Sequence, residues 1–123
     1  MLQFGTTENR IRTELERIFE RVPAASLCFD IGHARQIDPT MTEAWRILTK
    51  FGGRLLQVHV SEVGTSSRHD RLSFASKTAF QQVAHLIPEN VPLILETPAT
   101  ADTAMEEARE ASAALPLATQ QAA

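Results

Sequence analysis

The sequence has only one cysteine, Cys28, and no long hydrophobic run. A single cysteine excludes an internal disulfide bond. No apolar stretch approaches the roughly 18 residues of a membrane-spanning helix, and the N-terminus lacks the apolar core of a signal peptide. These absences favour a protein of the reducing cytoplasm without membrane contact. We expect Cys28 to be a packed thiol rather than a reactive one, because it lies inside an apolar run.

The chain also has little excess charge. Its net charge of −3 provides no bulk attraction to nucleic acid, which is therefore not expected as a partner. The hydrophobic content of 43% and the length of 123 residues are sufficient to form one globular domain. We expect a single domain over residues 1–123, with residues 116–123 as a disordered tail.

Three short apolar runs each end at a side chain that can bind a metal ion. They are Leu27–Phe29 before Asp30, Leu55–Val58 before His59, and Leu93–Leu95 before Glu96. Runs of this length and composition predict strands buried on both faces, as in a parallel sheet.

Helical patterns alternate with these runs and complete an α/β order. Apolar residues recur at helical spacing, and we predict helices over residues 7–22, 40–51, 76–87 and 100–115. Thr40 and Glu43 form a capping-box pattern at the start of the second helix. Residues 2–4 are either the stub of a further strand or a disordered start, so three to four βα units are expected.

The carboxyl ends of parallel strands meet at one rim of a sheet, where many enzymes place their sites. Asp30, His59 and Glu96 are therefore expected to gather there, although 29 and 37 residues separate them. Two carboxylates and one imidazole suit Mn²⁺, Mg²⁺, Co²⁺, Fe²⁺ or Zn²⁺. The alternatives are that Asp30 caps the following turn and that His59 is a core residue.

Two nearby segments add candidate residues. Gly32 permits a tight turn after Asp30, so that Asp30 and His33 can face one point. Residues 61–73 form a long polar connection, and such connections are usually functional or disordered. His69 in this segment is either a metal ligand, a substrate contact or a solvated side chain.

Three segments, residues 29–34, 58–62 and 93–98, resemble the last three strands of the xylose isomerase-like TIM barrels. That superfamily includes sugar-phosphate isomerases and epimerases and the family 2 apurinic endonucleases. The resemblance covers residues 7–115 and implies a partial (β/α) barrel of the TIM type. A complete barrel needs about 250 residues, so we expect the chain to be the C-terminal portion of one.

For the sugar isomerases and epimerases, the resemblance implies a divalent metal held by Asp30, His59 and Glu96. Glu96 would also be a catalytic acid–base residue. It further implies that His33, Arg68 and His69 contact the substrate, a sugar or sugar phosphate. The metal would polarise a carbonyl–hydroxyl pair while a carboxylate removes the neighbouring carbon-bound proton.

Two alternatives remain. In the endonuclease branch the resemblance implies a zinc cluster formed by Asp30, His33, His59, His69 and Glu96. Ser67 occupies the place of an aspartate in that branch, and the acidic net charge also counts against it. The other alternative is a non-catalytic half-barrel, because nothing acidic precedes Glu8 to match the family's further metal-binding glutamate. Such a half would need a second copy or a complementing chain.

Overall fold

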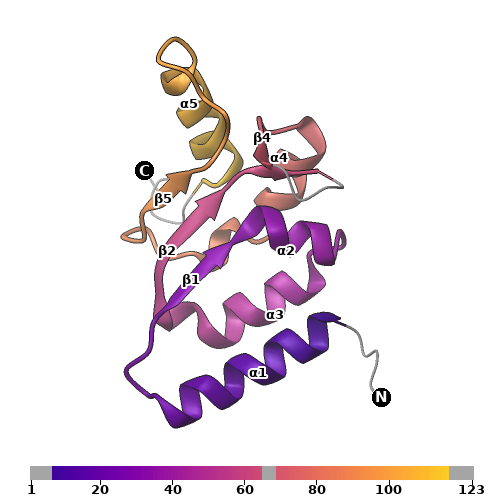
Figure 1. Cartoon of the computed structure of the whole chain (residues 1–123), viewed down its shortest axis with the longest axis vertical. Coiled ribbons are helices and arrows are strands. Elements are labelled where there is room, and N and C mark those ends of the chain that lie inside the picture. The colour runs from indigo at the N-terminus through magenta and orange to yellow at the C-terminus, as the bar shows by residue number, and fades with distance from the viewer. Residues whose placement is uncertain (1–6, 65–68, 117–123) are drawn as a thin grey trace.

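A three-stranded parallel sheet forms the centre of the protein, in a computed structural model that describes residues 7–64 and 69–116. Its strands are β1 (Leu27–Asp30), β2 (Leu55–Val60) and β5 (Leu93–Leu95), in the order β1-β2-β5. Figure 1 shows the three arrows pointing the same way. The expected α/β class with parallel strands is therefore confirmed. The possible strand at residues 2–4 and the tail after Pro116 lie outside the described residues.

Five α-helices and two 3₁₀ turns accompany the sheet within the described ranges. Helices were expected at four of these places, although the one predicted over residues 76–87 begins earlier and continues as a 3₁₀ turn. The fifth helix, α2, was not expected. The bounds are α1 Thr7–Arg21, α2 Ile31–Ile37, α3 Thr42–Phe51, η1 Gly52–Arg54, α4 Phe74–Gln81, η2 Ala84–Leu86 and α5 Ala104–Ala114.

Helix α2 replaces the tight turn predicted at Gly32. The helix begins directly after β1, and the Asp30 side chain caps it by accepting a hydrogen bond from the backbone N–H of His33 at 3.0 Å. Gly32 is helical and has no positive φ. A Cβ atom on Gly32 would lie 2.4 Å from the Ser61 carbonyl oxygen and 2.9 Å from a Val63 methyl carbon. Gly32 therefore serves close packing between α2 and the segment after β2.

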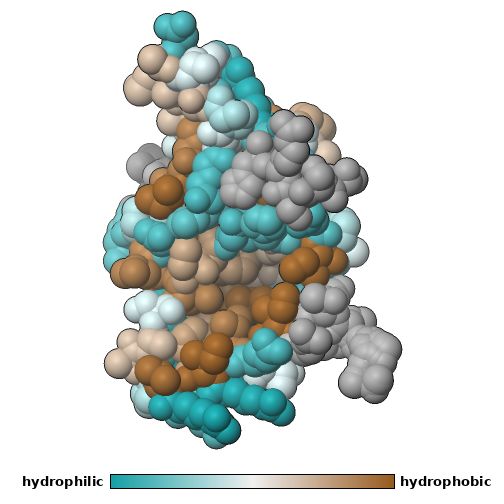
Figure 2. Space-filling view, in the orientation of Figure 1, coloured by the Kyte–Doolittle hydropathy of each residue, from teal (hydrophilic) through white to brown (hydrophobic). Residues whose placement is uncertain are grey.

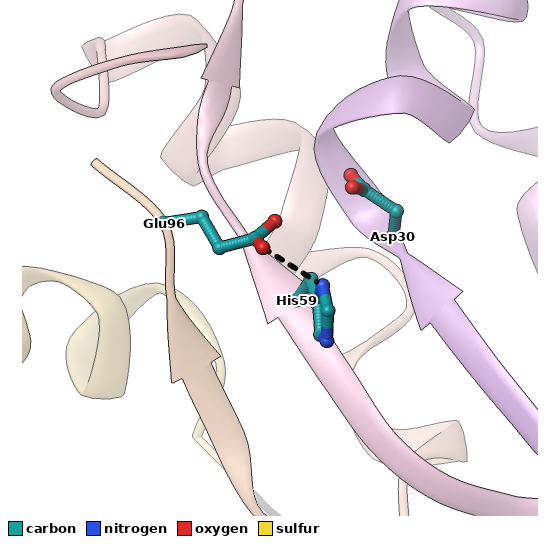
Figure 3. Close-up of side chains that lie close together, drawn as sticks. All are labelled: Asp30, His59 and Glu96. Carbon is teal, nitrogen blue, oxygen red and sulfur yellow. Dashed lines mark ion pairs between the residues drawn. The ribbon is translucent and has the colours of Figure 1, made fainter. Parts of the chain in front are cut away.

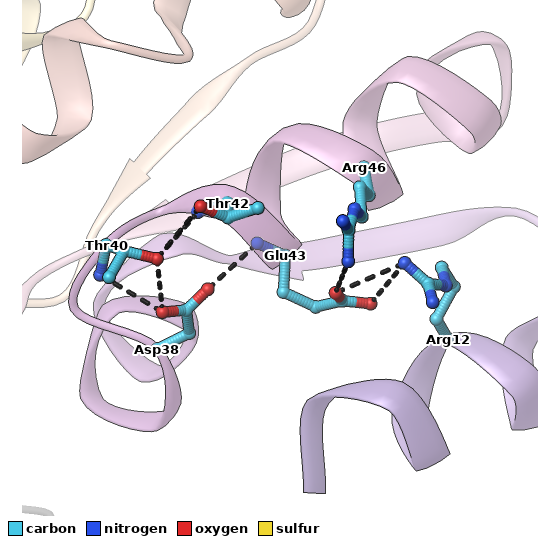
Figure 4. Close-up of polar contacts among 6 residues, drawn as sticks. All are labelled: Arg12, Asp38, Thr40, Thr42, Glu43 and Arg46. Atoms are coloured by element: carbon cyan, nitrogen blue, oxygen red, sulfur yellow. Dashed lines mark hydrogen bonds and ion pairs between the residues drawn. The ribbon is translucent and has the colours of Figure 1, made fainter. Parts of the chain in front are cut away.

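The capping box predicted from Thr40 and Glu43 does not form. Asp38 takes its place: one carboxylate oxygen accepts from the Glu43 N–H at 2.9 Å, and the other accepts from the Thr40 N–H and hydroxyl (Figure 4). The buried Met41 stands at the N-cap with φ of 64° and has no side chain that could cap. The nearby carboxylate of Asp38 therefore satisfies the helix start.

A buried ion pair connects the first and third helices. Glu43 of α3 is buried, and its carboxylate lies 3.0 Å from a guanidinium nitrogen of Arg12 on α1 (Figure 4). Arg46, one turn further along α3, approaches the same carboxylate at 3.5 Å. The two guanidinium groups compensate the charge that burial of Glu43 would otherwise leave unpaired.

Among the described residues, helices cover one face of the sheet only, which corrects the prediction of strands buried on both faces. Leu27, Phe29, Val58 and Val60 are buried in a core shared with the helices. The residues that alternate with them point to the opposite face of the sheet, where Cys28 is exposed. We call this side the open face. The expectation of a packed thiol was therefore wrong, because no described helix covers that side of β1.

The pairing between β1 and β2 contains an irregularity. The register moves from Leu27 opposite Leu55 to Cys28 opposite Gln57, so that Leu56 is an extra residue in the pair. Leu56 is 62% exposed. Figure 2 shows a hydrophilic band across the middle of the molecule, above a more hydrophobic area.

The segment over residues 61–73 contains a short hairpin, in place of the loop that was expected. β3 (Glu62–Val63) pairs with β4 (His69–Asp70) in antiparallel fashion.

Within the described ranges, none of the helices combines the length and apolarity that a bilayer crossing requires.

Candidate metal centre

Asp30, His59 and Glu96 project from the open face of the sheet because of the strand register. Asp30 pairs with His59 across β1 and β2, and His59 pairs with Ile94 across β2 and β5. The Glu96 N–H donates to the Val60 carbonyl at 2.9 Å and continues the pairing beyond β5. Since Glu96 lies two residues after Ile94, its side chain points to the same face.

The three side chains converge, as the sequence predicted. One ligand atom from each of Asp30, His59 and Glu96 lies within 4.8 Å of the others. Figure 3 shows the two carboxylates and the imidazole directed toward a common region from three different strand ends. His59 Nδ1 lies 3.1 Å from a Glu96 carboxylate oxygen. The side chains are 28%, 23% and 32% exposed respectively, so solvent and small ions can reach them.

Gln57 contacts the opposite side of the His59 ring and was not identified from the sequence. Its amide nitrogen lies 2.8 Å from His59 Nε2 and 3.5 Å from the Cys28 sulfur. The signal that could have identified it is its position two residues before His59, since alternate residues of a strand share a face.

His33 lies beside this cluster and is not part of it. Its Nε2 atom is 3.9 Å from an Asp30 carboxylate oxygen, and its Nδ1 atom is 3.2 Å from the Gln36 side-chain oxygen. Arg68 lies outside the described residues, and of His69 only the backbone, in β4, is described. The predicted substrate contacts of His33, Arg68 and His69 therefore stay predictions.

Glu62 of the hairpin connects it to two helices. Arg35 of α2 donates to the Glu62 carboxylate at 3.1 Å and to the Ser76 hydroxyl of α4 at 2.9 Å. The Ser73 N–H donates to the other Glu62 oxygen at 2.9 Å. Burial raises the pKa of Glu62, but hydrogen bonds from Ser76 and Ser73 and the charge of Arg35 outweigh it, so that the pKa lies below 4.5.

We expect Glu62→Gln to lower the free energy of unfolding at pH 7 by about 1–3 kcal/mol, the usual range for hydrogen bonds to a charged group. Because folding lowers this pKa, the stabilisation is complete above 4.5 and is lost as the pH falls through the folded value. The difference between wild type and variant should therefore shrink on acidification. Urea unfolding of both proteins between about pH 3 and about pH 7 would measure this difference in stability. Glu89→Gln, at an exposed carboxylate, is the control and should leave stability unchanged.

The donor set fits a divalent cation. Carboxylate and imidazole ligands bind Zn²⁺ at about 2.0–2.2 Å, so that two ligands of one ion are at most about 4.4 Å apart. The observed limit of 4.8 Å requires only a small inward movement of partly exposed side chains. Harder cations such as Mg²⁺ and Mn²⁺ also accept this oxygen-rich set.

Comparison with known proteins adds no family assignment. No family model matches the chain, and neither a curated protein nor a solved structure is significantly similar to it.

Proposed function

We propose that this protein binds a divalent metal ion through Asp30, His59 and Glu96 and performs sugar isomerase or epimerase chemistry within a barrel-like assembly. The convergence of these three side chains within 4.8 Å on the open face of a parallel sheet carries the proposal. The resemblance of the three strand segments to xylose isomerase-like barrels supports the choice of reaction. It also supports the interpretation of the sheet as part of a barrel.

The chemistry of this proposal divides between the cation and the chain. A bound cation would polarise adjacent carbonyl and hydroxyl oxygens of a sugar or sugar phosphate. Glu96 is the residue we assign to proton transfer, because its partly exposed carboxylate already faces the His59 imidazole and can face a ligand. To His33, whose Nε2 atom lies 3.9 Å from an Asp30 carboxylate oxygen, we assign the contact with a substrate hydroxyl.

The open sheet face bears on how the active protein is assembled. In the described ranges no element lies opposite Asp30, His59 and Glu96 to form a second wall around a substrate. We propose that a second copy or a complementing chain provides this wall and that turnover depends on it. Metal binding needs only the three side chains and is therefore the first step to test.

We expect the isolated chain to bind one Mn²⁺ ion and Glu96→Gln to weaken this binding by at least about 100-fold. That loss exceeds the 10–100-fold typical of residues that only support a ligand. Isothermal titration of the metal-free protein with Mn²⁺ measures both affinities. Glu20→Gln changes an exposed carboxylate of α1 and should leave the affinity unchanged. Absence of Mn²⁺ binding by wild type, or equal affinity in Glu96→Gln, would contradict the proposal.

A further inference from the structure

The amide of Gln57 occupies a central place on the open face, between the only cysteine and the candidate metal ligand His59. It lies on β2 directly opposite Cys28 of β1 and two residues before His59. Its nitrogen contacts both His59 Nε2, at 2.8 Å, and the Cys28 sulfur, at 3.5 Å. Each amide hydrogen therefore has an acceptor.

We propose that Gln57 is a positioning residue that acts with the Glu96 carboxylate to set which ring nitrogen of His59 carries the proton. This inference rests on the proposed metal function. When the Gln57 amide N–H donates to Nε2, that nitrogen must present its lone pair. The neutral ring then carries its proton on Nδ1, which points toward the Glu96 oxygen 3.1 Å away. The ring is thus held between an amide donor and a carboxylate acceptor.

Metal binding requires the opposite arrangement. The His59 atom that faces Glu96 is Nδ1, so it is the atom available to a cation shared with that carboxylate. A neutral ring bound through Nδ1 carries its proton on Nε2, and this N–H then needs an acceptor. Rotation of the Gln57 amide by a half turn exposes its oxygen to Nε2, and Cys28 can then donate its S–H to the same oxygen. The amide is therefore able to support both states.

A role in packing alone would give different results. Leucine has nearly the same size as glutamine and preserves the side-chain volume on this half-buried strand position. If Gln57 only fills space, Gln57→Leu should not change the proton distribution on the His59 ring. If Gln57 is a positioning residue, the same change should weaken the preference for the Nδ1–H form, because only the Glu96 carboxylate then favours it.

The first measurement uses the metal-free protein. We expect ¹⁵N NMR of labelled histidine, at a pH at which the ring is neutral, to show the Nδ1–H form of His59 as dominant in wild type. Gln57→Leu should raise the fraction of the Nε2–H form above that of wild type, while Glu96 continues to favour Nδ1–H. Gln57→Asn, whose amide is one methylene shorter, should do the same and guards against a folding defect in the leucine variant. Gln36→Leu is the control, since that amide contacts His33 and the Gly64 carbonyl instead.

The second measurement adds Zn²⁺, which is diamagnetic. We expect the His59 proton to move to Nε2 in wild type, and Gln57→Leu to weaken Zn²⁺ binding 10–100-fold while Gln36→Leu does not. If wild type binds no Zn²⁺ or Mn²⁺, the proposed function fails, and the metal-free spectra still decide the role of Gln57. A dominant Nε2–H form in metal-free wild type, or identical tautomers in Gln57→Leu and wild type, would overturn the inference.

Discussion

Gly32→Ala is expected to lower the free energy of unfolding by about 3 kcal/mol, the upper end of the range for overpacking. In an ordinary helix the same change stabilises by about 1 kcal/mol, because glycine is the more flexible residue in the unfolded chain. Here the new Cβ atom would lie 2.4 Å from the Ser61 carbonyl oxygen, a backbone atom that cannot rotate away. Guanidinium unfolding monitored by circular dichroism measures the difference.

Gly53→Ala is the matched control for this change. Nothing lies within 4 Å of a Cβ atom at Gly53, and its φ is not positive. We expect it to be neutral or to stabilise by up to about 1 kcal/mol. Wild-type stability in Gly32→Ala would contradict the close contact between α2 and Ser61. That contact fixes the start of α2 beside β2, and with it the position of Asp30 relative to His59.

Asp30 combines two roles, and two substitutions can separate them. Its carboxylate belongs to the metal cluster, and the same side chain accepts the hydrogen bond that caps α2. Asparagine caps a helix about as well as aspartate but lacks the charge. We therefore expect Asp30→Asn to weaken Mn²⁺ binding at least about 100-fold, beyond what loss of a supporting contact costs.

Stability should respond differently in the two variants. Asp30→Asn should remain within about 0.5 kcal/mol of wild type, whereas Asp30→Ala should lose about 1 kcal/mol because the cap is removed. Calorimetric titration and chemical unfolding of both variants provide the comparison. Undiminished Mn²⁺ affinity in Asp30→Asn would exclude Asp30 as a ligand. Equal stability of the two variants would show that the cap contributes nothing.

The convergence of Asp30, His59 and Glu96 could be predicted because strand direction and pairing are strong constraints. Each of the three strands is marked by an apolar run, and parallel pairing leaves little choice about where their carboxyl ends meet. Helices with long apolar stripes, such as α1 and α3, were predictable for the same reason: many residues contribute to one signal.

Features that depend on one or two residues were not predictable. A glycine after a strand is compatible with a tight turn or with close helix packing, and only the position of Ser61 decides between them. Thr40 and Glu43 satisfy the capping-box pattern, but Asp38 outcompetes Thr40 as the acceptor. An apolar strand of four residues is too short to reveal that one of its faces is open, and this is why the exposure of Cys28 was missed.

The exposed thiol of Cys28 has a practical consequence for the assembly question. As the sole cysteine, it permits a fluorophore or spin label to be attached at one defined position on the same face as the three candidate ligands. A chain that docks over this face would shield the sulfur from alkylating reagents. Labelling of Cys28 therefore tests directly whether a second copy or another chain covers this face, as proposed above.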